Sequence, residues 1–272
     1  MKIISWNIAH RREAWNELVG SDADIALLQE AVAPPSDLAS DVDVEDLPWV
    51  TASNGNLPWR ACIARFSRAV DIARIKTVPY EEVRPGVLGV SRMGSLSAAI
   101  VSTPDHDPVT LVSAYAAWQS PSASQNRNWI FADASAHRLL SDVASLIGKQ
   151  WGHRIIISGD FNILYGYGED RSMYWAARYQ TVFDRMQAMG LKFIGPQAPN
   201  GRQADPWPSE LPLDSENVPT FHSNRQTPET ATRQLDFVFA SQALAKDLTV
   251  KALNDPEEWG PSDHCRVVIE IG

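Results

Sequence analysis

Short runs of apolar residues recur along the chain, and several of them end in polar side chains. The run at 154–158 holds three consecutive isoleucines without polar alternation, which predicts a strand buried on both faces of a sheet. Gly159 follows, where we expect the strand to stop in a sharp turn, and Asp160 and Asn162 come next. Because positions i and i+2 of an extended segment point the same way, their carboxylate and carboxamide are expected to converge.

The same pattern occurs nearer the N-terminus. The apolar run at 25–28 predicts another buried strand, and Gln29 and Glu30 stand at its end. Functional sites gather at strand ends in α/β folds, and clustered oxygen ligands suit a hard cation and a reacting phosphate. Asp and Asn are also common turn formers, so the pair at 160 and 162 taken alone also has a purely structural interpretation.

The remaining pattern predicts alternating strands and helices in one domain spanning 1–272. Amphipathic spacing predicts helices at about 15–19, 136–147 and 174–189. Strands are expected at 2–6, 61–66, 69–76, 97–102, 109–114 and 235–239, and a final pair should bracket 260–264. We find no internal repeat and no linker that would split the chain.

Two stretches lack this periodicity. Segment 31–60 has the composition of a surface loop, with an acidic run that we interpret as solvated. Segment 195–234 carries seven of the 18 prolines. A loop of that length inside a compact domain is uncommon and is more often functional than not.

Composition narrows the class of protein. With 272 residues and 44% hydrophobic content, the chain can bury a full core. No apolar run approaches 18 residues, and the N-terminus runs directly into a strand, so we expect no membrane association and no signal peptide. Cys62 and Cys265 give no disulfide framework, which favours a reducing cytoplasm. We expect a monomer.

The charge balance bears on the substrate. The formal net charge is −9 and the pI is about 5.1. A protein that grips long nucleic acid by its backbone usually presents a basic face, so this balance argues against tight, non-specific duplex binding. A local basic patch or bound cations would still allow a nucleic-acid substrate.

Six short segments together form a constellation that resembles a known family. Their order and spacing are those of the endonuclease/exonuclease/phosphatase superfamily, whose members include DNase I-like nucleases, abasic-site endonucleases, inositol polyphosphate phosphatases and bacterial sphingomyelinases. The resemblance covers the whole chain and implies an α/β fold: a four-layer α/β sandwich of two packed mixed β-sheets flanked by helices. The segments are Trp6-Asn7, Leu28-Gln29-Glu30, Ser113-Ala114-Tyr115, Gly159-Asp160-Phe161-Asn162, Gln234-Leu235-Asp236-Phe237 and Ser262-Asp263-His264.

The resemblance implies a metal-dependent phosphoesterase. Glu30 would be the main Mg²⁺ ligand, with Asn7 holding the ion or the phosphate and Asp263 as a further metal-side carboxylate. Mn²⁺ is expected to substitute for Mg²⁺.

The same resemblance assigns the catalytic groups. Asp160, with Asn162 beside it, would orient or deprotonate the attacking water. His264 would contact the phosphoryl oxygen, and Asp236 would fix its tautomer and keep it cationic. Tyr115 would bind the phosphate or assist the leaving oxygen. The implied reaction is in-line attack by water without a covalent intermediate.

Some positions depart from the family pattern. Ala9 stands where abasic-site endonucleases often place an acid, which puts a second metal in doubt. His222 stands where those enzymes tend to place an aromatic residue, although Tyr115 is the residue of their branch. We therefore do not assign the chain to the repair branch. The histidines at 10, 137, 153 and 222 are interpreted as structural.

Two substrate classes remain open. Tyr115 and the aromatic and arginine side chains near the loops favour a nuclease acting on DNA or RNA. The acidic net charge favours a phosphomonoesterase or a small-molecule phosphodiesterase acting on a nucleotide, inositol phosphate or lipid headgroup. We also expect segment 195–234 to set substrate choice through Arg225 and Arg233 and to contribute little to the fold.

Overall fold

The computed structural model describes residues 1–50, 59–118 and 133–272. The first half of its core is a five-stranded sheet in the order β12-β13-β1-β2-β3. Within it β1 runs parallel to β2 and antiparallel to β13, so the sheet is mixed and joins the two ends of the chain. Its strands are β1 (Lys2–Asn7), β2 (Ile25–Ala31), β3 (Arg60–Arg65), β12 (Leu248–Leu253) and β13 (Arg266–Ile271).

The second half is a six-stranded sheet in the order β10-β11-β9-β8-β7-β4. Here β8 and β9 are parallel and the other pairs are antiparallel, so this sheet is also mixed. A two-stranded pair, β5 (Thr77–Pro79) and β6 (Leu88–Val90), lies outside both sheets. The six strands are β4 (Asp71–Ile75), β7 (Leu96–Thr103), β8 (His106–Tyr115), β9 (Ile155–Asp160), β10 (Leu191–Gly195) and β11 (Asp236–Ser241).

Alternate side chains of the central strands enter different apolar layers. In β9, Ile156 packs in the layer between the two sheets, whereas Ile155 and Ile157 pack in the layer beneath the helices. In β1, Ile3 faces the layer between the sheets and Ile4 faces the opposite side. This two-sided burial explains why these strands read as uninterrupted apolar runs.

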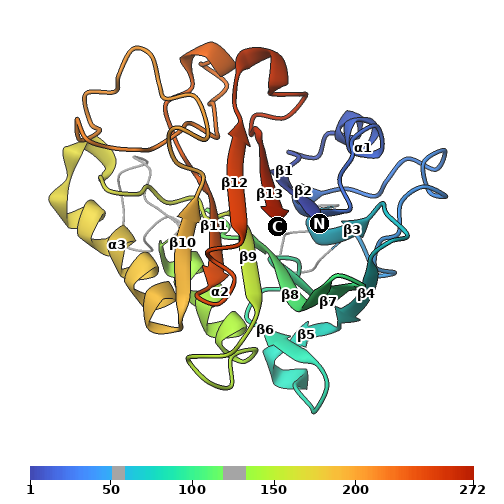
Figure 1. Ribbon diagram of the computed structural model, residues 1–272. Helices are drawn as coiled ribbons and strands as arrows, with labels where there is room; N and C mark the ends of the chain where they lie inside the picture. Colours follow the sequence, from blue (N-terminus) through green and yellow to red (C-terminus); the bar gives the residue numbers. More distant parts are fainter. Residues whose placement is uncertain (51–58, 119–132) are drawn as a thin grey trace.

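Helices cover the outer faces of both sheets (Figure 1). Helix α1 (Glu13–Val19) packs Trp15 and Leu18 on the five-stranded sheet. Helices α2 (Asp133–Ala144) and α3 (Met173–Ala188) pack on the six-stranded sheet. The layers confirm the expected four-layer α/β sandwich. Short 3₁₀ turns occur at Tyr80–Glu82, Glu169–Arg171, Pro228–Thr230 and Pro256–Glu258.

The structure corrects two expectations about strands. Strand β9 does not stop at Gly159 but continues through Asp160. Strand β10, an edge strand with an exposed Lys192, was not predicted. Positions 51–58 of the surface loop expected at 31–60 lie outside the described residues. In the parts that are described, no helix has the length and apolar character needed to cross a membrane.

The expectation that segment 195–234 contributes little to the fold is wrong. Val218 and Ala231 are fully buried in an apolar cluster with Trp259. The Thr220 hydroxyl accepts hydrogen bonds from the backbone N–H groups of Leu235 and Asp236, at 3.0 and 3.1 Å. The segment therefore supports strand β11. It lacks periodicity because it packs irregularly, although residues such as Val218 and Ala231 are buried.

Candidate active site

Three strands of the six-stranded sheet end side by side in register. Tyr115 of β8 pairs with Asp160 of β9, and Asp160 pairs with Asp236 of β11. Side chains of directly paired residues project to the same face of a sheet, so these three functional groups form one row. All three are buried.

Gly159 makes this row possible. A Cβ atom at position 159 would lie only 1.9 Å from the Ala114 carbonyl oxygen of β8. Glycine is required here because the two strands approach so closely, and not because the chain turns. The close approach holds Tyr115 and Asp160 at adjacent strand ends.

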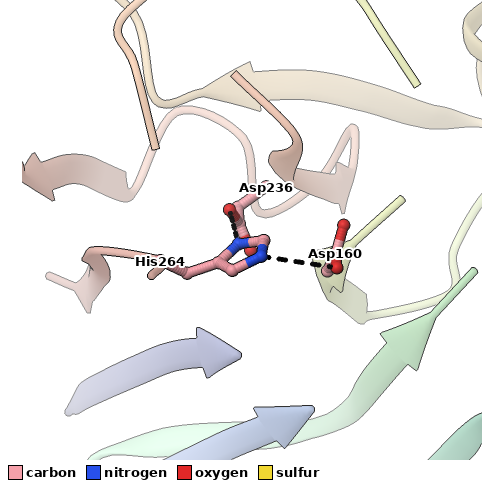
Figure 2. Close-up of side chains that lie close together, drawn as sticks. All are labelled: Asp160, Asp236 and His264. Atoms are coloured by element: carbon pink, nitrogen blue, oxygen red, sulfur yellow. Dashed lines mark hydrogen bonds and ion pairs between the residues drawn. The ribbon is translucent and has the colours of Figure 1, made fainter. Parts of the chain in front are cut away.

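His264 bridges two of these carboxylates (Figure 2). Its Nδ1 atom lies 2.8 Å from Asp236 Oδ2, and its Nε2 atom lies 3.8 Å from Asp160 Oδ2. Burial by itself lowers the pKa of His264, but the charges of Asp236 and Asp160 and the hydrogen bond to Asp236 raise it to about 10. The imidazole is therefore a cation at neutral pH and offers its Nε2–H as a donor.

The turn that carries His264 leads into β13 and is tied to β1, its neighbour in the five-stranded sheet. The Ser262 hydroxyl donates to the Asn7 carbonyl oxygen at 2.6 Å and accepts from the His264 backbone N–H at 3.1 Å. The Trp6 indole N–H donates to the His264 carbonyl oxygen at 2.8 Å. On the other side the Phe221 ring packs against the imidazole, with centroids 4.9 Å apart. These contacts fix the imidazole before any substrate binds.

Asn7 brings the five-stranded sheet into the site. Its side-chain N–H₂ group donates to Asp160 Oδ2 at 2.9 Å and lies 3.4 Å from Glu30 Oε1. The side-chain oxygen of Asn7, Oδ1, accepts from the Ala9 backbone N–H at 3.0 Å, which fixes the orientation of the amide. One carboxamide thus links a carboxylate of each sheet.

Glu30 is presented by a break in strand β2. Its φ of 47° is left-handed, and the pairing of β2 with β3 shifts register between Leu28 and Ala31. Burial raises the pKa of Glu30, but the hydrogen bond and charge of His10 and a hydrogen bond from Tyr115 outweigh it, so the net pKa is lowered. The side chain is therefore an ionised carboxylate that is still 19% exposed.

Asn162 reaches Asp160 by a different route from the one expected. It lies beyond the strand with a left-handed φ of 50°. Its backbone N–H donates to Asp160 Oδ1 at 2.9 Å, and its side-chain N–H₂ donates to Asp160 Oδ2 at 3.0 Å and to the Ala116 carbonyl oxygen at 3.0 Å. The two side chains converge because the chain turns back on itself, not because the segment is extended.

Several charged groups and hydrogen-bond donors surround the Asp160 carboxyl. Burial raises its pKa to about 8, with the charges of Asp236 and Glu30 adding to the rise and His264 opposing it. Its oxygens accept from Asn7 and Asn162. A positive charge placed beside Asp160 and Glu30 would relieve this accumulation of negative charge.

This donor set fits a hard divalent cation. Glu30 and Asp160 offer carboxylate oxygens, and both lie against the same Asn7 amide. Mg²⁺ takes one or two carboxylates and keeps several waters, which the partial exposure of Glu30 permits. Asp160, Asp236 and His264 also place potential ligand atoms within 4.8 Å of one another. A cationic imidazole donates and does not ligate, so the Glu30 side of Asp160 is the better position.

A buried layer beneath the site joins the two sheets. The Gln29 side chain donates to the Ser113 hydroxyl at 2.9 Å, and that hydroxyl donates to the Leu28 carbonyl oxygen at 2.7 Å. Both side chains are fully buried. These bonds set the spacing between Glu30 on one sheet and Tyr115 on the other.

The remaining sequence-predicted residues lie at different distances from this centre. Asp263 is half-buried next to His264, and its charge helps to raise the histidine pKa. Arg233 is paired with Glu169 at 2.8 Å, although its backbone bridges to Phe221. Arg225 is exposed on the surface. The site geometry thus gathers the carboxylates and histidine but brings neither guanidinium group into direct contact with them.

Sequence reasoning missed the role of His10. Its Nε2 atom lies 2.9 Å from Glu30 Oε2, and its ring packs on Trp59 with centroids 5.6 Å apart. Trp59 in turn meets Tyr115 edge-on at 5.1 Å. The only signal in the sequence was the short distance of His10 from Asn7. It had been interpreted as structural because it belongs to none of the six segments.

Comparisons with solved structures identify proteins of one fold. The chain matches the AP endonuclease LMAP from Leishmania major with a TM-score of 0.64 and 18% identity, covering 98% of this chain and 86% of that one. It matches the endonuclease domain of TRAS1, a telomere-specific non-LTR retrotransposon, with a TM-score of 0.61 and 17% identity over 99% and 97% of the chains. It also matches the 3′ phosphatase NExo from Neisseria, bound to a product DNA hairpin, with a TM-score of 0.58 and 17% identity over 100% and 99%.

These matches define the fold as that of the endonuclease/exonuclease/phosphatase, or DNase I-like, proteins. A further match to an endonuclease/exonuclease/phosphatase from Bacteroides vulgatus, with a TM-score of 0.59 and 14% identity, agrees with this. The resemblance drawn from the six segments is confirmed at the level of the fold. No protein-family model and no curated protein sequence matches the chain.

Proposed function

We propose that the protein is a Mg²⁺-dependent phosphoesterase that hydrolyses phosphodiester bonds in DNA or RNA. The observation that carries this proposal is the grouping of Glu30 and Asn7 from one sheet with Asp160, Asp236 and His264 around a single point. The solved structures of this fold include nucleases and a 3′ phosphatase, which supports the same reaction class.

Glu30 would hold the cation, with Asp263 as a nearby carboxylate. The Asn7 amide presents its N–H₂ group to Glu30 and Asp160, so it would orient these carboxylates and would not itself bind the ion. A bound Mg²⁺ supplies Lewis-acid polarisation of a phosphoryl oxygen and compensates the carboxylates around it. Glu30 is suited to this role because it is ionised and accessible. Mn²⁺ prefers the same oxygen donors and is expected to substitute.

Asp160 would orient the attacking water and accept its proton. Asn162 donates to the Asp160 carboxylate and so fixes its direction. Asp160 is buried, and burial raises the pKa of its carboxyl, which makes the ionised form a stronger base. A cation bound beside Glu30 would keep that form populated at neutral pH. Asp236 needs no contact with substrate, because it acts by holding His264.

His264 and Tyr115 would contact the phosphate. The His264 imidazolium offers its Nε2–H towards the space in front of Asp160 and neutralises charge that develops on the phosphoryl oxygens. Burial raises the pKa of Tyr115 well above its usual range, with the charges of Glu30 and Asp160 adding to the effect. Tyr115 therefore remains a hydrogen-bond donor at neutral pH.

A substrate panel tests the proposal. The purified protein is assayed with Mg²⁺, with Mn²⁺ and with EDTA on single-stranded DNA, duplex DNA, abasic DNA, RNA and phosphomonoesters. We expect metal-dependent cleavage of a nucleic acid that is abolished in Asp160→Asn and retained in Asp107→Asn, a matched change of an exposed carboxylate. Absence of cleavage of every nucleic acid in the panel would overturn the nuclease assignment.

One observation favours a second candidate. The net charge of −9 disfavours long polyanions, and a small phosphomonoester or small-molecule phosphodiester avoids that repulsion. NExo, which is similar in structure, is a 3′ phosphatase, so another protein of this fold acts on a phosphomonoester. Turnover of phosphomonoesters, nucleotides or inositol phosphates alone would select this alternative.

A further inference from the structure

A cavity of about 330 Å³ opens beside the candidate active site. It lies between the turn preceding β7, the end of β8 and one face of α2. The volume is at the lower end of the range for small-molecule sites and suits one compact group, not a whole duplex. Tyr115, which belongs to the catalytic row, forms part of its wall. The cavity and the candidate active site therefore share a side chain.

Two arginines from separate elements line this cavity. Arg92 comes from the turn before β7, and Arg138 comes from α2, one turn beyond the buried Ser135. Ser95, also buried, lies in the wall, and its hydroxyl donates to the Arg92 carbonyl oxygen at 2.6 Å, which braces the turn that carries Arg92. Guanidinium groups present planar sets of N–H donors that match the oxygens of a phosphate, and hydroxyl groups complete such a shell.

Among the described residues of the lining, Asp142 is the only carboxylate, and it is already engaged. Ser91 donates to it twice, through its hydroxyl at 2.5 Å and its backbone N–H at 2.9 Å. Asp142 thus fixes the turn that carries Arg92. The described residues of the lining thus carry two guanidinium charges and one carboxylate, a formal charge of +1 on a chain whose total charge is −9.

The cavity is coupled to the reaction centre through Tyr115. Tyr115 lines the cavity together with Arg92, and its phenol hydrogen-bonds to Glu30. The Tyr115 backbone N–H donates to the Ser95 carbonyl oxygen at 2.8 Å, which ties the cavity wall to the end of β8. A group held by Arg92 would therefore sit next to a phosphate bound at Glu30.

We propose that this cavity binds a second phosphate of the substrate, adjacent to the scissile phosphodiester. The inference rests on the proposed phosphodiesterase function and adds a substrate class to it: chains that carry another phosphate one residue from the cleaved bond. A terminal phosphomonoester and an internal diester share the required oxygens. The cavity lies on the Tyr115 side of the site, so we expect the preference for a phosphate on one side of the scissile bond only.

The experiment compares minimal substrates. A dinucleotide with a single phosphodiester is cleaved alongside the same dinucleotide carrying a 5′-phosphate or a 3′-phosphate, and alongside trinucleotides that supply an internal diester instead. We expect one phosphorylated dinucleotide to be cleaved with a kcat/KM about 10- to 100-fold above the unphosphorylated one, the range expected for charged hydrogen bonds. The trinucleotide arm distinguishes a terminal from an internal phosphate.

Arg92→Gln and Arg138→Gln should bring the ratio of these kcat/KM values towards one, and Arg138→Lys should keep part of it because the charge remains. Arg68→Gln, an exposed arginine outside the cavity lining, is the control. A wild-type ratio near one for both phosphorylated dinucleotides would overturn the inference even if a variant failed to fold. So would a ratio that survives both glutamine substitutions. Absence of cleavage of every substrate of the panel would instead count against the proposed function itself.

Discussion

The His10 imidazole lies 2.9 Å from the Glu30 carboxylate, at the edge of the candidate metal position. Both residues have left-handed backbone conformations, with φ of 61° and 47°, and the His10 backbone N–H donates to the Glu30 carbonyl oxygen at 3.2 Å. Residues in this region of φ occur mainly where the surrounding structure imposes them. Two tight bends therefore bring a basic side chain against the principal acidic one.

His10 is expected to keep Glu30 ionised. Burial alone raises the Glu30 pKa, and the hydrogen bond and charge of His10 reverse that rise. In His10→Ala the pKa of Glu30 should move upward, measured by ¹³C NMR of the carboxylate in metal-free protein. His106→Ala, on the distant end of β8, should leave the carboxylate signal unchanged. An unaltered Glu30 titration in His10→Ala would show that the contact has no electrostatic consequence.

Glu30 is expected to carry the metal dependence. Glu30→Gln keeps the shape of the side chain and removes its charge, so we expect a higher Mg²⁺ requirement and a loss of turnover of at least about 100-fold. Initial rates against Mg²⁺ concentration measure both effects. Glu270→Gln, an exposed glutamate of β13, is the matched control. Full activity of the wild-type protein after EDTA treatment would contradict the metal mechanism.

His264 is expected to be charged throughout the neutral range. Its pKa is raised from 6.5 to about 10 despite burial, because of Asp236 and Asp160. The stabilisation from this pairing is therefore complete below about pH 6.5 and is lost as the pH rises towards 10. Imidazole NMR on metal-free protein should show His264 titrating last, whereas burial lowers the pKa of His137 below its usual value.

The Asp236→Asn variant supplies the test of cause. This substitution removes the Asp236 charge, which counteracts the effect of burial on the His264 pKa. The pKa of His264 should therefore fall, and the loss of unfolding free energy between pH 6.5 and 10 should become smaller. Activity of the wild-type protein should fall on the alkaline side, where the imidazolium loses its proton. Titration of His264 below 6.5 in the wild-type protein would refute the assignment.

Thr220 is expected to hold Asp236 in place. Its hydroxyl accepts from two buried backbone donors, and Thr220→Val leaves both unsatisfied while preserving shape. At about 1–3 kcal/mol for each of the two lost partners, we expect a decrease in unfolding free energy of about 2–6 kcal/mol, measured by urea denaturation. Thr220→Ser retains the acceptor and should recover most of it. Equal urea midpoints for the valine variant and the wild-type protein would refute this role.

Arg225 and Arg233 should differ in a way that the sequence did not suggest. Arg233 pairs at 2.8 Å with Glu169, which is only 15% exposed, so Arg233→Ala should cost about 1–2 kcal/mol of stability. Arg225 is exposed, and Arg225→Ala should leave the unfolding midpoint unchanged. Urea denaturation of the two variants side by side measures this. A destabilised Arg225→Ala or an unaffected Arg233→Ala would reverse the assignment of the structural arginine.

The sequence predicted those parts of the fold whose signal is local. The isoleucine run of β9 and the amphipathic faces of α2 and α3 depend on burial alone, and they lie close to the expected positions. Strand β10 was not predicted because a five-residue edge strand with an exposed Lys192 has neither a continuous apolar run nor an alternation of apolar and polar residues. The packing of segment 195–234 escaped because Thr220 and Val218 are buried by contacts distant in sequence.

The candidate site divides in the same way. Glu30 and Asp160 lie at or near the ends of apolar strands, so the pattern of the sequence predicted their positions. The contact of His10 with Glu30 depends on two left-handed residues, which no pattern of polar and apolar positions encodes. The turn at Asn162 shows the converse case, since the expected convergence is present but is produced by another backbone conformation.

The bond from the Trp6 indole to the His264 carbonyl spans 258 positions of sequence. Closing a loop of that size costs chain entropy, which is recovered when β1 and β13 pair and complete the five-stranded sheet. The His264 turn, which leads into β13, reaches Asp160 and Asp236 of the six-stranded sheet only when that pairing is made and the two sheets are docked. During refolding, catalytic competence should arise with the final docking event, so that regain of activity reports on the last step and not on strand formation.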